Sequence, residues 1–149
     1  MTLTAEIGVA STPFEGSGDL RFSNDITFTG TEYGSQAAPQ TATGTAVLTA
    51  AQMTGGILVG TPAATANYTT LTGTLLEAAL SSTIATDDTF DLCIINLGVA
   101  GDIITLVGGT GVTVVGSATV DDAGTDINSS GVFRFRRSAA NTFIAYRIS

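Results

Sequence analysis

The stretch Phe90-Asp-Leu-Cys-Ile-Ile-Asn-Leu97 decides the fold, because it is apolar on both of the faces that a strand would present. A strand with one solvated face alternates apolar and polar residues, whereas a strand covered on both faces is a nearly continuous apolar run. We therefore expect this stretch to lie centrally in a sheet or at an interface. Cys93 has apolar neighbours and is expected to be a small core residue. As the only cysteine, it cannot form an internal disulfide.

Short apolar segments separated by turn residues surround this stretch on both sides. The predicted strands are 45–48, 57–59, 67–71, 90–97, 103–107, 112–120, 132–137 and 142–148. The run Gly108-Gly-Thr-Gly111 resembles a phosphate-binding loop in its glycine content, but the chain has no lysine to complete one, so a turn is expected there. About seven or eight short strands predict an all-β domain, a β-sandwich or jelly-roll.

One or two short helices interrupt the strands. Thr49-Ala-Ala-Gln52 fits a capping box, with Thr49 as the N-cap, and Gly55 and Gly56 end that turn. Thr74-Leu-Leu-Glu77 fits a second box and predicts a helix over about 74–81.

Residues 1–42 differ from the rest, since they are poor in aliphatic side chains and rich in small polar residues. Within them, a hairpin is expected over residues 19–29, and residues 32–43 are expected to form a linker. The apolar side chains of the hairpin are Leu20, Phe22, Ile26 and Phe28. We therefore predict two regions: an N-terminal arm with a hairpin at 1–42 and a β-sandwich domain at 43–149.

The composition excludes several classes of function. The chain has no His, Lys or Trp, a formal net charge of -8 and a sequence pI of about 4.1. Without His, the usual proton shuttle near neutral pH is absent, and zinc sites draw mainly on His and Cys. A strongly acidic chain repels nucleic acid and anionic membranes. We predict no enzyme and no cofactor, and the sequence shows neither a secretory signal nor a membrane-spanning stretch.

Two acidic clusters could carry oxygen-ligand or carboxylate chemistry. They are Asp87, Asp88 and Asp91, and Asp121, Asp122 and Asp126. Oxygen-rich loops can hold Ca²⁺, and a carboxylate pair can hydrolyse glycosides. Neither cluster has the spacing of a known calcium loop, and Asp is an ordinary turn residue. We predict no metal site and interpret both clusters as solvated turns.

Four of the five side-chain cations lie near the C-terminus. They are Arg134, Arg136, Arg137 and Arg147. Strand alternation places Arg134 and Arg136 on one side, opposite Phe133 and Phe135. Two interpretations stay open: a solvated strand face balanced by local acids, or arginines that meet acidic groups of a neighbouring subunit, since the guanidinium fork binds carboxylates bidentately.

Residues 44–149 show a familiar order of segments. The segments are VLTAAQMTGGILV (47–59), ANYTTL (66–71), LLEAAL (75–80), FDLCIINL (90–97), ITLVGGTGVTVVG (104–116), FRFRR (133–137) and NTFIAYR (141–147). This order resembles small virion proteins of tailed bacteriophages, namely capsid decoration (cement) proteins or head domains of short fibres. The resemblance covers about two-thirds of the chain and rests on the overall pattern.

The resemblance implies a trimeric β-sandwich that clips onto a capsid lattice. The function expected first is that of a decoration protein that binds the outer shell and stabilises coat subunits. Its partners would be the major capsid protein and copies of itself, and the arm would attach to one or the other. The alternative is a fibre or receptor-binding head domain of the same virion. A carbohydrate-active enzyme ranks below both.

Overall fold

The computed structural model describes residues 35–80, 82–99, 101–124 and 129–149. These residues form two sheets, which we name A and B. In spatial order, sheet A holds β1 (Gln40–Ala42), β3 (Ile57–Gly60), β5 (Thr89–Asn96), β9 (Ser130–Ala139), β10 (Thr142–Arg147) and β7 (Val112–Val115). Sheet B holds β2 (Ala46–Val47), β4 (Ala66–Thr69), β6 (Ile104–Val107) and β8 (Thr119–Val120). Two helices complete the described part, α1 (Ala50–Thr54) and α2 (Gly73–Ala79).

The prediction of an all-β sandwich or jelly-roll with seven or eight strands is wrong. The described residues form ten strands in two mixed sheets, and parallel pairs join β1 to β3, β3 to β5, β2 to β4, β4 to β6, and β10 to β7. Antiparallel pairing joins β5 to β9, β9 to β10, and β6 to β8. With helices in two of the connections, the arrangement is closer to an α/β fold.

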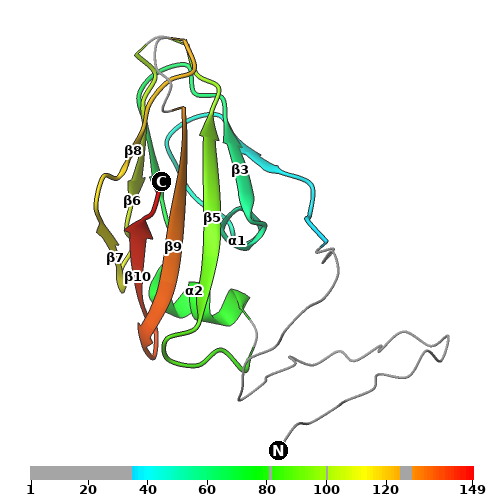
Figure 1. Ribbon diagram of the computed structural model, residues 1–149, viewed down its shortest axis with the longest axis vertical. Coiled ribbons are helices and arrows are strands. Elements are labelled where there is room, and N and C mark those ends of the chain that lie inside the picture. Colours follow the sequence, from blue (N-terminus) through cyan, green and yellow to red (C-terminus); the bar gives the residue numbers. More distant parts are fainter. Residues whose placement is uncertain (1–34, 81, 100, 125–128) are drawn as a thin grey trace, which may run out of the picture. The chain divides into compact units, whose positions relative to one another are not determined.

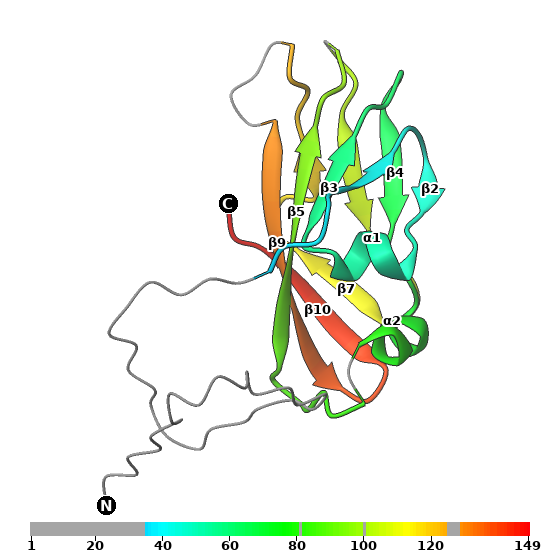
Figure 2. The same cartoon turned by 90° about the vertical axis from the view of Figure 1, so that its right-hand side faces the viewer.

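The parallel pairs follow from the path of the chain. From β1 to β9 the strands alternate between the sheets, so that odd-numbered strands enter sheet A and even-numbered strands enter sheet B (Figures 1 and 2). Strands two apart in sequence can then lie side by side in one sheet. Parallel neighbours need a crossover connection, and here that connection passes through the opposite sheet, together with α1 or α2 in four of the five parallel pairs.

Short-range signals place most of these elements correctly. The predicted strands at 57–59, 90–97, 103–107, 132–137 and 142–148 are confirmed by β3, β5, β6, β9 and β10. Gly108 to Gly111 form the turn between β6 and β7, as expected. The predicted strand 112–120 is wrong as one element, because the chain bends at Gly116, which has a φ of 90°. Its first half is β7 of sheet A and its second half is β8 of sheet B.

Of the two predicted helix caps, one is confirmed and one is wrong. The capping box of Thr49 and Gln52 is confirmed, with the Gln52 amide donating to the Thr49 oxygen and the Thr49 amide donating to the Gln52 side chain at 2.8 Å. The second box is wrong. The N-cap of α2 is Thr72, whose hydroxyl accepts from the Leu75 amide, so the helix begins one residue earlier than predicted. Glu77 is thereby left for a different contact, described below.

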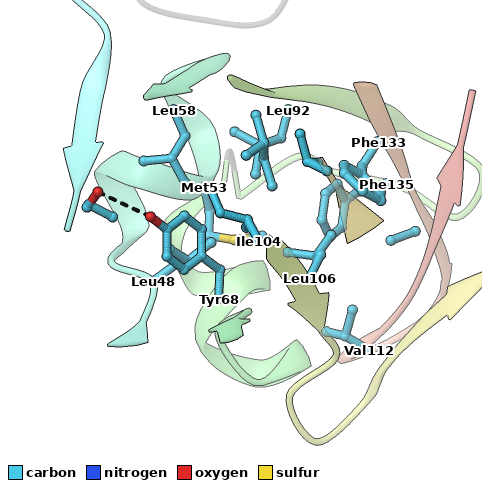
Figure 3. Packing of buried hydrophobic residues seen from close by; sticks show 14 of the residues in the cluster. Leu48, Met53, Leu58, Tyr68, Leu92, Ile104, Leu106, Val112, Phe133 and Phe135 are labelled. Atoms are coloured by element: carbon cyan, nitrogen blue, oxygen red, sulfur yellow. Dashed lines mark hydrogen bonds between the residues drawn. The ribbon is translucent and has the colours of Figure 1, made fainter. Parts of the chain in front are cut away.

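The core lies between the sheets and is closed by the helices. The aromatic side chains of Tyr68, Phe133, Phe135 and Phe143 are fully buried there. Figure 3 shows Phe133 and Phe135 of sheet A together with Ile104 and Leu106 of sheet B, and Met53 of α1 reaching between the layers. The hydroxyl of Tyr68 donates to the Ala42 carbonyl of β1 at 3.1 Å, which satisfies a buried polar group and ties the two sheets together.

Strand β5 has the central position that its sequence predicts. It lies third among the six strands of sheet A, with β3 on one side and β9 on the other. Leu92 and Ile94 are buried in the core. Cys93 lies between Leu92 and Ile94 along the strand, so its side chain is on the outward face and is partly exposed. The expectation that it belongs to the core is therefore wrong. Partial burial still raises the pKa of its thiol.

Candidate interaction surface

Sheet A has an inner face, covered by sheet B and the helices, and an outer face that no described element covers (Figures 1 and 2). The residues of the outer face alternate with the core residues along each strand. Six apolar residues are adjacent on it, five on β3, β5 and β9 and one just after the end of β10, and we call them the outer apolar patch: Ile57, Val59, Cys93, Ile95, Val132 and Ile148. Ile148 is exposed, and the other five are partly exposed.

Strand register makes this patch contiguous. Ile57 is paired with Cys93, and Cys93 is paired with Val132, so these three side chains form one row across β3, β5 and β9. Val59 and Ile95 are paired in the next row. Side chains directly opposite each other on neighbouring strands lie close enough to touch. The patch is therefore one continuous apolar surface.

Ion pairs border the patch on the same face. Arg134 of β9 is paired with Asp91 of β5 in the strand register and donates two hydrogen bonds to its carboxylate, at 2.8 and 2.7 Å. These bonds hold the pKa of Asp91 below its usual value. Arg136 is paired with Asp87 through an ion pair and is 3.4 Å from the Tyr146 hydroxyl. The apolar patch is thus bordered by charged side chains that neutralise one another.

The outer face of sheet B provides a comparison within the same chain. Its outward residues include Asn67, Thr69, Thr105 and Thr119. Val47 and Val107 lie on either side of Thr69 in one row across β2, β4 and β6. Threonine and asparagine suit a solvated strand surface. Sheet A presents aliphatic side chains at several outward positions of β3, β5 and β9, beside the ion pairs of Arg134 and Arg136. The two outer faces therefore differ in chemistry although one chain builds both.

Arg137 lies on the other side of β9 and ties α2 to the β9–β10 turn. Its guanidinium makes two hydrogen bonds of 3.0 Å to the Glu77 carboxylate, and the Asn141 amide donates to the same carboxylate at 2.6 Å. The Arg137 and Asn141 hydrogen bonds hold the pKa of Glu77 below its usual value. Glu77 therefore works as a tertiary clamp in place of the helix cap that the sequence predicted.

The Glu77 clamp makes stability depend on pH in a defined direction. A carboxylate whose pKa is lowered by folding stabilises the fold above its unfolded-state pKa of about 4.3, and this contribution is lost as the pH falls through the folded-state pKa. Urea unfolding at a series of pH values should therefore show a gap in free energy between the natural protein and Glu77→Gln that is largest at neutral pH and shrinks in acid. The gap should shrink only in part in high salt, because salt screens partly buried pairs such as this one less than exposed pairs. A gap that stays constant down to about pH 3 would contradict the clamp.

Arg147 of β10 joins strands of both sheets. Its Nη1 donates to the Thr119 carbonyl of β8 at 2.6 Å, and its Nη2 donates to the Ser130 carbonyl of β9 at 3.1 Å. Its guanidinium also lies over the ring of Phe133, 5.2 Å from the centroid, as in a cation–π contact. Arg147 therefore acts as an internal connector at the end of the sheets.

Several carboxylates of the acidic clusters accept hydrogen bonds within the described part of the chain. Asp88 accepts from the Ala85 amide at 2.7 Å, and Asp122 accepts from the amides of Gly101 and Gly124 at 3.0 and 2.8 Å. Asp126 lies outside the described residues. Within the described ranges, no group of three or more Cys, Asp and Glu side chains is placed to hold a metal ion. No described helix is long and apolar enough to cross a membrane.

The structure describes the predicted interface arginines but not the predicted interface residues of the hairpin. Three of the four arginines pair with acids of the same subunit, which is the arrangement that the local-acid interpretation describes. Contact of these arginines across a subunit boundary stays a prediction. Leu20, Phe22, Ile26 and Phe28 lie outside the described residues, and so does the hairpin that carries them. The attachment role of the arm also stays a prediction. Strand β1, within the predicted linker, is part of sheet A.

Sequence reasoning did not find the outer apolar patch. The signal available was the unbroken apolar run of residues 90–97, which predicted either a central strand or an interface. The structure shows that β5 is central and that one of its two apolar faces is uncovered by described residues.

No protein-family model matches the chain, and no curated protein or solved structure matches it either.

Proposed function

We propose that this chain is a virion structural protein, a capsid decoration protein that binds the outer shell of a tailed bacteriophage as a homotrimer and stabilises the coat subunits. The observation that supports it is the outer apolar patch with its margin of ion pairs, which fits the contact between subunits of the homotrimer. Contiguous exposed apolar surface of this kind marks protein interaction sites. The proposal also draws on the order of segments in residues 44–149, which resembles such proteins.

The anatomy of the outer face of sheet A suits a protein partner. Protein interfaces combine an apolar centre, poor in unpaired charge, with a polar rim. The face has its apolar residues in the middle strands, and Arg134 and Arg136 at its margin are already neutralised by Asp91 and Asp87. Basic groups that pair with acids of their own subunit are poorly suited to phosphate, and the net charge of -8 repels nucleic acid. A protein surface is the partner that fits.

Purified protein added to capsids that lack it tests the proposal. We expect it to bind on the outside of the shell in a number of copies that scales with the number of coat subunits, and to raise the temperature at which the capsids come apart, because a bound partner stabilises the assembled state. Quantitative gel analysis gives the copy number, and electron microscopy of the same particles gives the location. Binding at one or a few vertices would favour the fibre alternative. No binding to any capsid surface would contradict both.

A further inference from the structure

We infer that the outer face of sheet A is the contact surface between copies of this chain, with the outer apolar patch at its centre. The inference rests on the homo-oligomer in the proposed function and names the surface that forms it. The occupant is a second copy of the chain. Three observations support this choice: the contrast between the two sheets, the distribution of charge, and the size of the face.

The contrast between the sheets separates the face that needs a cover from the face that does not. Sheet B presents mainly Asn67, Thr105 and Thr119 outward, side chains that water can solvate, with Val47 and Val107 as its exposed apolar residues. Sheet A presents Ile57, Ile95 and Val132 at comparable outward positions. A strand that is apolar on both faces is typical of sheets covered on both sides. The described residues supply the cover for the inner face alone.

The charge distribution indicates a second copy as the cover. Two chains with a net charge of -8 repel each other, and this repulsion is strongest where unpaired acids face unpaired acids. On the outer face of sheet A, the acids Asp87 and Asp91 are each paired with an arginine. The face is therefore locally neutral in an acidic chain. Identical copies can approach each other there with little electrostatic cost.

The face is large enough for a specific contact. Its six strands contain 35 residues, and at about 3.3 Å per residue and about 4.8 Å between strands they project over roughly 550 Å². Side-chain relief makes the accessible area larger than this projection. A standard interface buries about 800 Å² on each partner. The outer face therefore approaches the area that a stable contact between two subunits needs.

A pair of matched arginine variants tests the inference. Ile95 and Thr105 are both outward-facing, partly exposed strand residues, but Ile95 lies in the patch on sheet A and Thr105 lies on sheet B. Ile95→Arg would place an unpaired charge in the contact and should weaken self-association at least about 100-fold, as measured by sedimentation and light scattering. Thr105→Arg adds the same charge and should leave the oligomer intact. Circular dichroism should show both variants folded.

Cys93 allows a second measurement on the natural protein, which does not depend on a variant folding. Its thiol lies in the patch between Ile57 and Val132 in the strand register. Alkylation of Cys93 should become slower as the protein is concentrated and copies cover the patch, and it should become fast again on dilution. An oligomer whose Cys93 reacts at the same rate at every concentration would overturn the inference, because the contact would then lie on another face. A natural protein that stays monomeric at high concentration would overturn it as well.

Failure of this inference and failure of the proposed function are distinguishable. If Ile95→Arg is monomeric and the natural protein oligomerises but binds no capsid, the contact surface stands and the decoration function fails. If the natural protein binds capsids while Cys93 stays fully reactive on them and in solution, the function stands and the contact surface is wrong.

Discussion

Gly73→Ala is expected to destabilise the domain by about 3 kcal/mol, the upper end of the usual cost of overpacking and a large fraction of the stability of an ordinary domain. Gly73 begins α2 and is buried. A Cβ atom at this position would lie 1.9 Å from the carbonyl oxygen of Asn141 and 3.2 Å from that of Gly111. Both obstacles are backbone atoms, which cannot rotate away as a side chain can. The substitution must therefore move either the helix or the turns against it.

The surroundings of Gly73 show why those turns cannot move freely. The Gly73 amide donates to the Thr110 carbonyl at 2.8 Å, and Phe143 of β10 donates to the Gly111 carbonyl at 2.9 Å. Asn141 itself has a φ of 55° and is held by Glu77. The start of α2, the β6–β7 turn and the β9–β10 turn thus meet at one point. Any movement that makes room for a methyl group at Gly73 would break several of these hydrogen bonds.

Urea unfolding measures the effect of Gly73→Ala, with Gly44→Ala as the matched control. A Cβ atom at Gly44 would meet nothing within 4 Å, and its backbone φ does not lie in the left-handed region. The control should therefore change the free energy of unfolding by no more than about 0.5–1 kcal/mol, with a slight stabilisation the expected sign. Equal effects of the two substitutions would show that the contact between α2 and the two turns is not close-packed.

Phe135→Ala is the second substitution with a large expected effect, about 3–5 kcal/mol. Phe135 is fully buried on β9, and its ring stacks on Phe90 of β5 with 4.9 Å between the centroids and 7° between the planes. The alanine variant removes the apolar contacts of a whole ring and leaves a cavity between the sheets. The packed layers around it can collapse only in part, which is why the cost exceeds the transfer free energy of the ring.

Phe90→Ala is the matched control for the same stack. Phe90 is directly opposite Phe135 in the strand register but is only partly buried, so its loss should cost less. A double-mutant cycle with both alanine substitutions should give a coupling of about 0.5–1.5 kcal/mol, the range for aromatic pairs. Chemical denaturation of the four proteins supplies all the terms. A coupling near zero would mean that the two rings are stabilised independently by their other neighbours.

Local chemistry made much of the secondary structure predictable. The alternation of Phe133 and Phe135 with Arg134 and Arg136 predicted a strand with one buried face, and the structure confirms it because the period of a strand is two in any sheet. The capping box at Thr49 was predictable for a similar reason, since both of its hydrogen bonds span three residues. Glu77 shows the limit of such signals. Its carboxylate was within reach of a local cap, and a tertiary ion pair with Arg137 holds it instead.

The sheet arrangement was not predictable from the same patterns. Hydrophobic periodicity reports which side of a strand is buried, but not which sheet the strand joins. The run 112–120 illustrates this, because its regular alternation conceals a bend at Gly116 that sends β7 and β8 into different sheets. The parallel pairs arise from the same alternation between sheets, which depends on contacts far apart in the sequence. A prediction built from neighbouring segments therefore expected an all-β fold.

The sequence by itself determined the strand-rich character of the domain, the double-sided apolar nature of residues 90–97, and a charge balance that repels nucleic acid. These properties depend on residue type and on spacings of a few residues, so they are the same whatever tertiary fold the chain adopts. The tertiary structure alone decided that Arg134, Arg136 and Arg137 find acids in their own subunit, and that Ile57, Cys93 and Val132 meet in one row. The arginines and their acidic partners lie 43 to 60 residues apart in the sequence. Strand register and helix packing bring them together, and no local sequence pattern predicts such pairs.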